Sequence, residues 1–149
     1  MKPTLRLPAL TIEAARYLLA PVGEWNVFAL IEDGRLSHVW NVAVRQGRRE
    51  LRILPASVER YLARRAGRTV PPITDRAALD FFLPDGERPP WLPIRHVWHS
   101  FNMDDQQALA LVRAGELELA PGTVIRSGIP GARIATASFC RFLERRRVL

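Results

Sequence analysis

The sequence contains one cysteine and no long apolar run, and both absences limit what the protein can be. Cys140 has no second cysteine to pair with, so the chain forms no internal disulfide and suits a reducing compartment. No apolar run approaches the roughly 20 residues that a membrane helix needs. Residues 1–6 also lack the apolar core of a signal peptide. We therefore expect a cytoplasmic protein with no membrane partner.

Signatures of catalysis are missing as well. The sequence has no glycine-rich phosphate loop, no Gly-x-Ser-x-Gly element and no convincing Cys–His pairing. His96 and His99 have a spacing that metal ligands use, but no nearby set of cysteines or carboxylates completes a zinc site. We therefore expect no enzymatic activity, no cofactor, no metal and no small-molecule substrate.

The positive charge of the chain is clustered. The formal net charge is +7 over 149 residues. Residues 45–68 carry eight arginines against two glutamates, and residues 141–147 carry four arginines against one glutamate, so the remainder is slightly acidic. A coding bias can explain why arginine replaces lysine, but it does not explain this clustering. Clustered positive charge is typical of nucleic-acid-binding proteins.

The sequence also contains an internal repeat. Residues 28–65 align without a gap on residues 109–146, which lie 81 positions later. Of the 38 pairs, 14 are identical, whereas average residue usage would give about three or four. The chain is therefore interpreted as a tandem duplication. We predict a first unit over residues 1–66, a proline-rich linker with a short helix over 67–95, and a second unit over 96–149.

Hydrophobic periodicity predicts the elements of each unit, with Thr11 and Thr74 as helix N-caps and Gly34 and Gly115 as helix stops. In the first unit we expect helices over 10–19 and 24–33, a hairpin of strands 38–44 and 50–54, and a helix over 55–65. In the second we expect a helix over 104–114, a hairpin around 126–131, a strand at 133–134 and a helix over 136–146. The linker helix, 74–83, is either a packed connector or the displaced first helix of the second unit. The expected fold class is α+β, mainly α, with a helix-turn-helix, a hairpin wing and a closing helix in each unit.

Short motifs in a fixed order carry a resemblance. The first unit contains Thr11-Ile12-Glu13-Ala14-Ala15, Gly34-Arg35-Leu36, Arg52-Ile53 and Tyr61-Leu62, and it resembles the excisionase and MerR-type winged helix-turn-helix family. The second unit repeats only the later motifs, as Gly115-Glu116-Leu117, Arg133-Ile134 and Phe142-Leu143. The resemblance implies a protein of bacterial or phage type that binds double-stranded DNA at the nucleoid, as a transcriptional regulator or an excisionase-like accessory factor.

The resemblance also implies two sets of DNA contacts. Residues at the start of each recognition helix would read base edges in the major groove. These are Glu24, Trp25, Asn26, Ala29, Asp105, Gln106, Gln107 and Arg113. Arginines of the wings and helix ends would contact phosphates or the minor groove. These are Arg45, Arg48, Arg49, Arg52, Arg64, Arg65, Arg126, Arg133, Arg145 and Arg146. The linker would set the separation of the two units, and linkage would raise their joint affinity.

Some of these assignments have structural alternatives. Arg52 and Arg133 precede a buried isoleucine and could pair with an acid such as Glu32 or Glu50, and Trp25 could belong to the core. Asp105 and its neighbour Asp104 suit helix capping better than a surface that faces phosphates. The second unit lacks the Thr-x-Glu-Ala-Ala motif and could instead mediate homodimerisation or bind a protein. The alternative function is therefore a non-enzymatic protein-interaction module built on repurposed winged helices.

Overall fold

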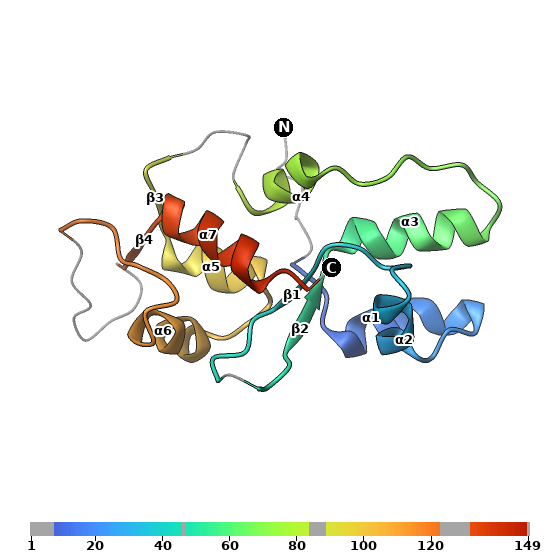
Figure 1. Cartoon of the computed structure of the whole chain (residues 1–149), viewed down its shortest axis with the longest axis horizontal. Coiled ribbons are helices and arrows are strands. Elements are labelled where there is room, and N and C mark those ends of the chain that lie inside the picture. Colours follow the sequence, from blue (N-terminus) through green and yellow to red (C-terminus); the bar gives the residue numbers. More distant parts are fainter. Residues whose placement is uncertain (1–7, 46, 84–88, 123–131, 149) are drawn as a thin grey trace.

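The computed structural model describes residues 8–45, 47–83, 89–122 and 132–148 (Figure 1). The first half of the chain contains α1 (Ile12–Leu19), the 3-10 turn η1 (Ala20–Val22), α2 (Val27–Glu32), β1 (Val39–Asn41), β2 (Leu51–Ile53) and α3 (Pro55–Arg65). A connecting helix, α4 (Asp75–Phe82), follows. The second half contains β3 (Trp91–Pro93), α5 (Ile94–Ser100), α6 (Asp105–Arg113), β4 (Arg133–Ala135) and α7 (Thr136–Arg146). The fold is α+β and mainly helical, as the sequence predicts.

Most helix boundaries follow from local caps. Thr11, Asn26, Thr74 and Asp104 each accept a hydrogen bond from the backbone N–H three residues later, which is the contact made by an N-cap residue. The bounds of α3 and α7 are those expected from the sequence. Helix α2 is shorter than expected, because Asn26 caps it and the helix begins at Val27 instead of residue 24.

Two glycines end the second helix of each half in the same way. Gly34 follows α2 with a φ of 73° and Gly115 follows α6 with a φ of 76°, a left-handed conformation that favours glycine. The Gly34 N–H donates to the carbonyl of Ile31, and the Gly115 N–H donates to that of Val112, both at 3.0 Å. Both predicted helix stops are confirmed.

Other contacts also recur 81 positions apart. The Ser57 hydroxyl accepts from the N–H of Ser37 at 2.8 Å, and the Ser138 hydroxyl accepts from the N–H of Glu118 at 2.8 Å. The bounds of α3 and α7 differ by the same 81 positions. The matched sequence positions therefore form matched local structure.

Pairing across the sheets relates α5 to α1. Leu10, just before α1, forms an antiparallel bridge with Ile53, while Leu92, just before α5, pairs with Ile134. Helix α5 therefore occupies in the second half the place that α1 occupies in the first. Residues 91–95, expected in the linker, belong to β3 and α5. Of the two alternatives for α4, the packed connector agrees with the structure.

The described residues form two hydrophobic core clusters, and the hairpin of β1 and β2 contributes to both. The smaller cluster joins α1, α2 and α3 with Val39 and Ile53. The larger one contains α4 and the second half together with Trp40, Val42 and Leu54 of the first half. Successive strand residues face opposite sides, so β1 divides its side chains between the clusters.

The two halves therefore pack against each other directly. The centre of the Trp40 ring lies 6.3 Å from that of Phe101 in the second half, edge to face. The backbone joins the halves as well, because the Ala9 N–H donates to Ser100 O at 2.8 Å and the Val148 N–H donates to Val39 O at 2.7 Å. This arrangement corrects the expectation that a linker sets the separation of two independent units.

Candidate nucleic-acid interface

Three of the predicted DNA-binding features lie along one long edge of the molecule. Figure 1 shows α2, the loop between β1 and β2, and α6 along this edge, with α4 on the opposite one. We call residues 42–45 and 47–50 of this loop the arginine loop. The edge therefore presents parts of both halves to the same side.

Asn41 holds the arginine loop in shape. Its side-chain amide donates to Arg48 O at 2.9 Å, and its amide oxygen accepts from the N–H groups of Ala43 and Glu50, both at 3.1 Å. The predicted wing arginines Arg45, Arg48 and Arg49 are exposed. Within the described ranges their guanidinium groups form no hydrogen bond or ion pair. The loop thus carries three guanidinium groups without a described partner, together with the carboxylate of Glu50.

The turn before α2 differs from the expectation. Glu24, Trp25 and Asn26 precede the helix instead of forming its first turn. The Glu24 carboxylate accepts from Tyr61 Oη at 2.8 Å and from Arg65 Nη1 at 2.6 Å, so it ties this turn to α3. The Asn26 amide oxygen is occupied as the N-cap acceptor. Trp25 is 64% exposed, which rules out a core role for it. Ala29, in α2, is half-buried.

In the second half, α6 supports the arginine loop. The Gln107 side-chain amide donates to Val42 O at 2.9 Å and to the Glu50 carboxylate at 2.8 Å. Asp105 is half-buried in the first turn of α6, where the interaction of its negative charge with the helix dipole stabilises the helix. Gln106 and Arg113 remain exposed. Gln107 was expected to face bases, but the structure commits its amide to an internal contact.

Arg52 also has an internal role. Its guanidinium donates to the carbonyls of Phe101 at 2.7 Å, Asn102 at 3.3 Å and Leu51 at 3.1 Å. The last carbonyls of a helix lack helical donors. Arg52 donates to two carbonyls at the end of α5, those of the C-cap residue Phe101 and of Asn102. Burial lowers the pKa of this guanidinium, while the charge of Glu50 raises it. The structural alternative therefore agrees with the contacts, although the direct acceptors are carbonyls and not an acid.

The remaining predicted arginines divide into bonded and unbonded groups. Arg146 donates to Ala43 O at 2.8 Å and lies 3.4 Å from the Glu116 carboxylate, to which Arg145 donates at 3.2 Å. The Arg133 guanidinium lies 4.2 Å from the centre of the Trp91 ring, a cation–π contact. Arg65 is paired with Glu24, as described above. Arg64 is exposed and its guanidinium has no described partner. Arg126, with its hairpin, lies outside the described residues.

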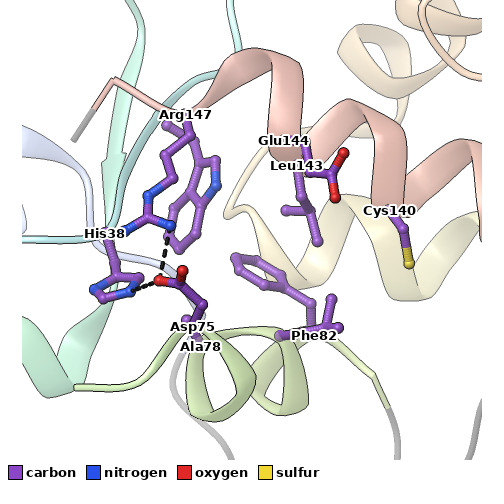
Figure 2. A pocket seen from close by; sticks show the side chains of 10 residues that line it. His38, Asp75, Ala78, Phe82, Cys140, Leu143, Glu144 and Arg147 are labelled. Carbon is purple, nitrogen blue, oxygen red and sulfur yellow. Dashed lines mark hydrogen bonds and ion pairs between the residues drawn. The ribbon is translucent and has the colours of Figure 1, made fainter.

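A polar cluster that the sequence analysis missed joins three segments beside a pocket. Figure 2 shows Asp75 of α4 pointing toward both His38 and Arg147. The Asp75 carboxylate lies 3.1 Å from His38 Nε2 and accepts from Arg147 Nη1 at 2.8 Å. The Arg147 hydrogen bond, followed by the His38 one, lowers the pKa of Asp75. The residues that line the adjoining pocket of about 250 Å³ include Trp40, Phe82 and Leu143.

This cluster has residue types that serine hydrolases use, since Ser37 Oγ lies 2.9 Å from His38 Nδ1. Two features differ from a catalytic triad, in which the carboxylate is buried and the histidine reaches the substrate. Asp75 has a 77% exposed side chain and is paired with Arg147, whereas His38 is only 3% exposed. We therefore assign the cluster a structural role in fastening α4 and the segment after α7 to β1.

Two further features of the described residues concern metal binding and membrane insertion. These residues contain no group of three or more histidine, cysteine, aspartate or glutamate side chains placed to hold a metal ion. The His96 ring contacts the carbonyl of Phe82 and the hydroxyl of Ser100. None of the helices that the structure describes combines the length and apolarity required to cross a lipid bilayer.

No protein-family profile matches the chain, and neither a curated protein nor a solved structure shows significant similarity to it.

Proposed function

We propose that the protein binds double-stranded DNA through the helix-turn-helix of α1 and α2 and through the arginine loop. In this proposal it is a tandem winged-helix protein that acts as a transcriptional regulator or an excisionase-like accessory factor. The observation that carries the proposal is the arginine loop, with three exposed guanidinium groups that have no described partner. Because duplex DNA is a dense array of phosphates, such a loop favours contact with its backbone or its narrow minor groove.

The exposed side chains at the start of α2 favour apolar contacts to bases over hydrogen bonds to them. Trp25 is 64% and Phe28 is 40% exposed there, and Asn26 lies between them. Because the Asn26 oxygen caps the helix, this residue cannot form a bidentate pair with adenine while the cap is intact. The two aromatic side chains suit apolar contact with thymine methyl groups instead. We therefore expect modest sequence selectivity.

The second half acts in this proposal mainly as a support for the arginine loop. Gln107 and Arg146 both donate to loop carbonyls, at 2.9 Å to Val42 and at 2.8 Å to Ala43. A loop fixed before binding loses less conformational entropy on binding. Only Gln106 and Arg113 of the described second-half candidates project freely from α6. We therefore expect a footprint of about one helical turn, or roughly 10 base pairs, instead of two.

Alanine substitution of Arg45, Arg48 and Arg49 together tests the proposal. Binding of a labelled random-sequence duplex is measured by fluorescence anisotropy at several salt concentrations. Loss of three phosphate contacts would reduce the slope of log affinity against log salt by about 2.7 and weaken binding to all sequences. The control replaces Arg68, Arg76 and Arg95, which are also exposed, by alanine. Absence of duplex binding by the unaltered protein at low salt would contradict the proposal.

One observation favours the alternative, a protein-interaction module. Tyr17, Leu18, Trp25 and Phe28 on α1, α2 and the turn between them are 81%, 42%, 64% and 40% exposed. Exposed apolar groups gathered on one motif are typical of association surfaces. They lie in the first half, although the sequence suggested a partner site in the second. In a homodimer formed through this surface, the double variant W25A/F28A would convert dimers to monomers in sedimentation experiments and leave any salt dependence of DNA binding unchanged.

A further inference from the structure

The two halves differ in charge at one matched place. Each half ends its last helix with two arginines, Arg64 and Arg65 in α3 and their equivalents in α7. In the second half, Glu116 lies 3.2 Å from Arg145 and 3.4 Å from Arg146 and compensates their charge. The residue 81 positions before Glu116 is Arg35. The first half therefore has a positive charge where the second has the compensating negative one.

This reversal creates a positively charged concavity in the first half. Arg35, Tyr61, Arg64 and Arg65 line a space of about 300 Å³. Glu24 is bonded to Arg65 at 2.6 Å and to the Tyr61 hydroxyl at 2.8 Å. Arg35 and Arg64 are exposed, and neither guanidinium has a hydrogen-bond or ion-pair partner among the described residues. Two of the three guanidinium groups in this concavity are thus uncompensated.

The helix dipole explains only part of this arrangement. Cations are favourable in the last turn of a helix, which accounts for Arg64 and Arg65 at the end of α3. Arg35 lies after α2, outside any helix, and lines the same space as the two α3 arginines, so it adds a third guanidinium group there. Its charge raises the repulsion within the concavity, and a bound anion would relieve that repulsion. Planar guanidinium groups match the oxygen geometry of phosphate particularly well.

We propose that this concavity binds a phosphate group. The inference rests on the proposed function, so the phosphate group is a backbone phosphodiester of the bound duplex. Glu24 connects the concavity to the DNA-facing turn, because it is bonded to two lining residues and directly precedes Trp25 and Asn26. The role of Glu24 is to position Arg65 and Tyr61, while Arg35 and Arg64 contact the phosphate.

The variant Arg35→Glu tests this inference, since it installs the charge that the second half carries at the matched position. The control is Arg76→Glu, which makes the same change in net charge on an exposed residue of α4, on the opposite edge (Figure 1). Circular dichroism and thermal unfolding check that both variants fold. Duplex binding is measured by anisotropy over a range of salt, and binding of inorganic phosphate is measured separately by NMR titration of arginine side-chain resonances.

We expect Arg35→Glu to weaken duplex binding at least tenfold more than Arg76→Glu. It should also reduce the salt slope by about 1, the value for one lost phosphate contact. Arg64→Ala should act in the same direction with a smaller effect. In the phosphate titration, the Arg35 and Arg64 resonances of the unaltered protein should shift, and the Arg64 shift should disappear in Arg35→Glu.

The outcomes separate this inference from the proposed function. If the unaltered protein binds duplex and the two glutamate variants lose affinity equally, the phosphate site is refuted and the DNA-binding proposal stands. If it binds no duplex but shows Arg35-dependent shifts with inorganic phosphate, the DNA-binding proposal is refuted and the concavity is a site for a free phosphate group. Absence of both effects refutes the inference.

Discussion

Replacing Ser57 or Ser138 by alanine removes the same hydrogen bond from two places in the chain. Each hydroxyl is 3% exposed and accepts at 2.8 Å from the N–H of a residue just after the second helix of its half. Each bond fastens that segment to the closing helix, α3 or α7. The repeat therefore makes a quantitative prediction, because two substitutions far apart in the sequence should cost nearly the same free energy of unfolding.

The magnitude follows from the lost acceptor and the change in helix propensity. An N–H group left without its acceptor in a partly buried place costs about 1–2 kcal/mol. Alanine in a helix recovers about 0.5 kcal/mol relative to serine. We therefore expect each variant to lower the free energy of unfolding by about 1 kcal/mol, with the two values within about 0.5 kcal/mol of each other.

Urea unfolding measures these values, with the four tryptophans as fluorescent probes and circular dichroism as a second signal. A loss of 1 kcal/mol should lower the midpoint by about 0.5 M without changing the slope of the transition. Ser100→Ala is the control, because its hydroxyl mainly donates to the carbonyl of His96 in the preceding turn of α5, and we expect a change within about 0.5 kcal/mol. The reasoning is refuted if one serine variant matches this control while the other loses 1 kcal/mol or more.

Three further predictions concern stability. Gly34→Ala and Gly115→Ala should each cost about 1–2 kcal/mol, since both residues have positive φ and a new Cβ meets no neighbouring atom; urea unfolding measures this, and equal stability of variant and parent would contradict it. Arg52→Ala should lower the free energy of unfolding by about 2 kcal/mol by leaving the terminal carbonyls of α5 without donors, and Arg52→Lys should fall in between because it lacks the planar fork. The hydrogen bonds from Arg147 and His38 stabilise Asp75 as a carboxylate and lower its pKa, so their contribution is complete above about pH 4, the usual value for an unfolded aspartate, and is lost as the pH falls further. Acid unfolding of Asp75→Asn should therefore lack this component, and identical acid sensitivity of variant and parent would count against the cluster with Arg147.

Local signals in the sequence predicted the elements that depend on neighbouring residues. These elements depend on contacts between residues only a few positions apart. They include the caps Thr11 and Thr74, the helix stops Gly34 and Gly115, and the bounds of α3 and α7. Such contacts depend on residue type and spacing, which the sequence displays directly. Helix α2 is shorter than the sequence predicts because Asn26, a good capping residue, ends the helix at its N-terminal side instead of belonging to it.

Strand β3 and helix α5 were missed for a different reason. The segment from Trp91 to Pro93 is short and contains proline, and it forms a strand only because it pairs with residues 133–135. That pairing joins positions about 40 residues apart, and no local pattern reveals it. The proline-rich composition therefore suggested a linker where the structure has the first elements of the second half.

The sequence by itself determined the repeat, the mainly helical α+β class and the clustering of arginine, because these are properties of residue order and spacing. Only the tertiary structure decided which polar side chains remain available for a partner. Gln107, Arg52 and Arg146 are bonded internally across the two halves, while Arg45, Arg48 and Arg49 of the arginine loop have no described partner. The physical reason is that a guanidinium or amide group is satisfied by whichever carbonyl or carboxylate the packing of distant segments brings within hydrogen-bond distance.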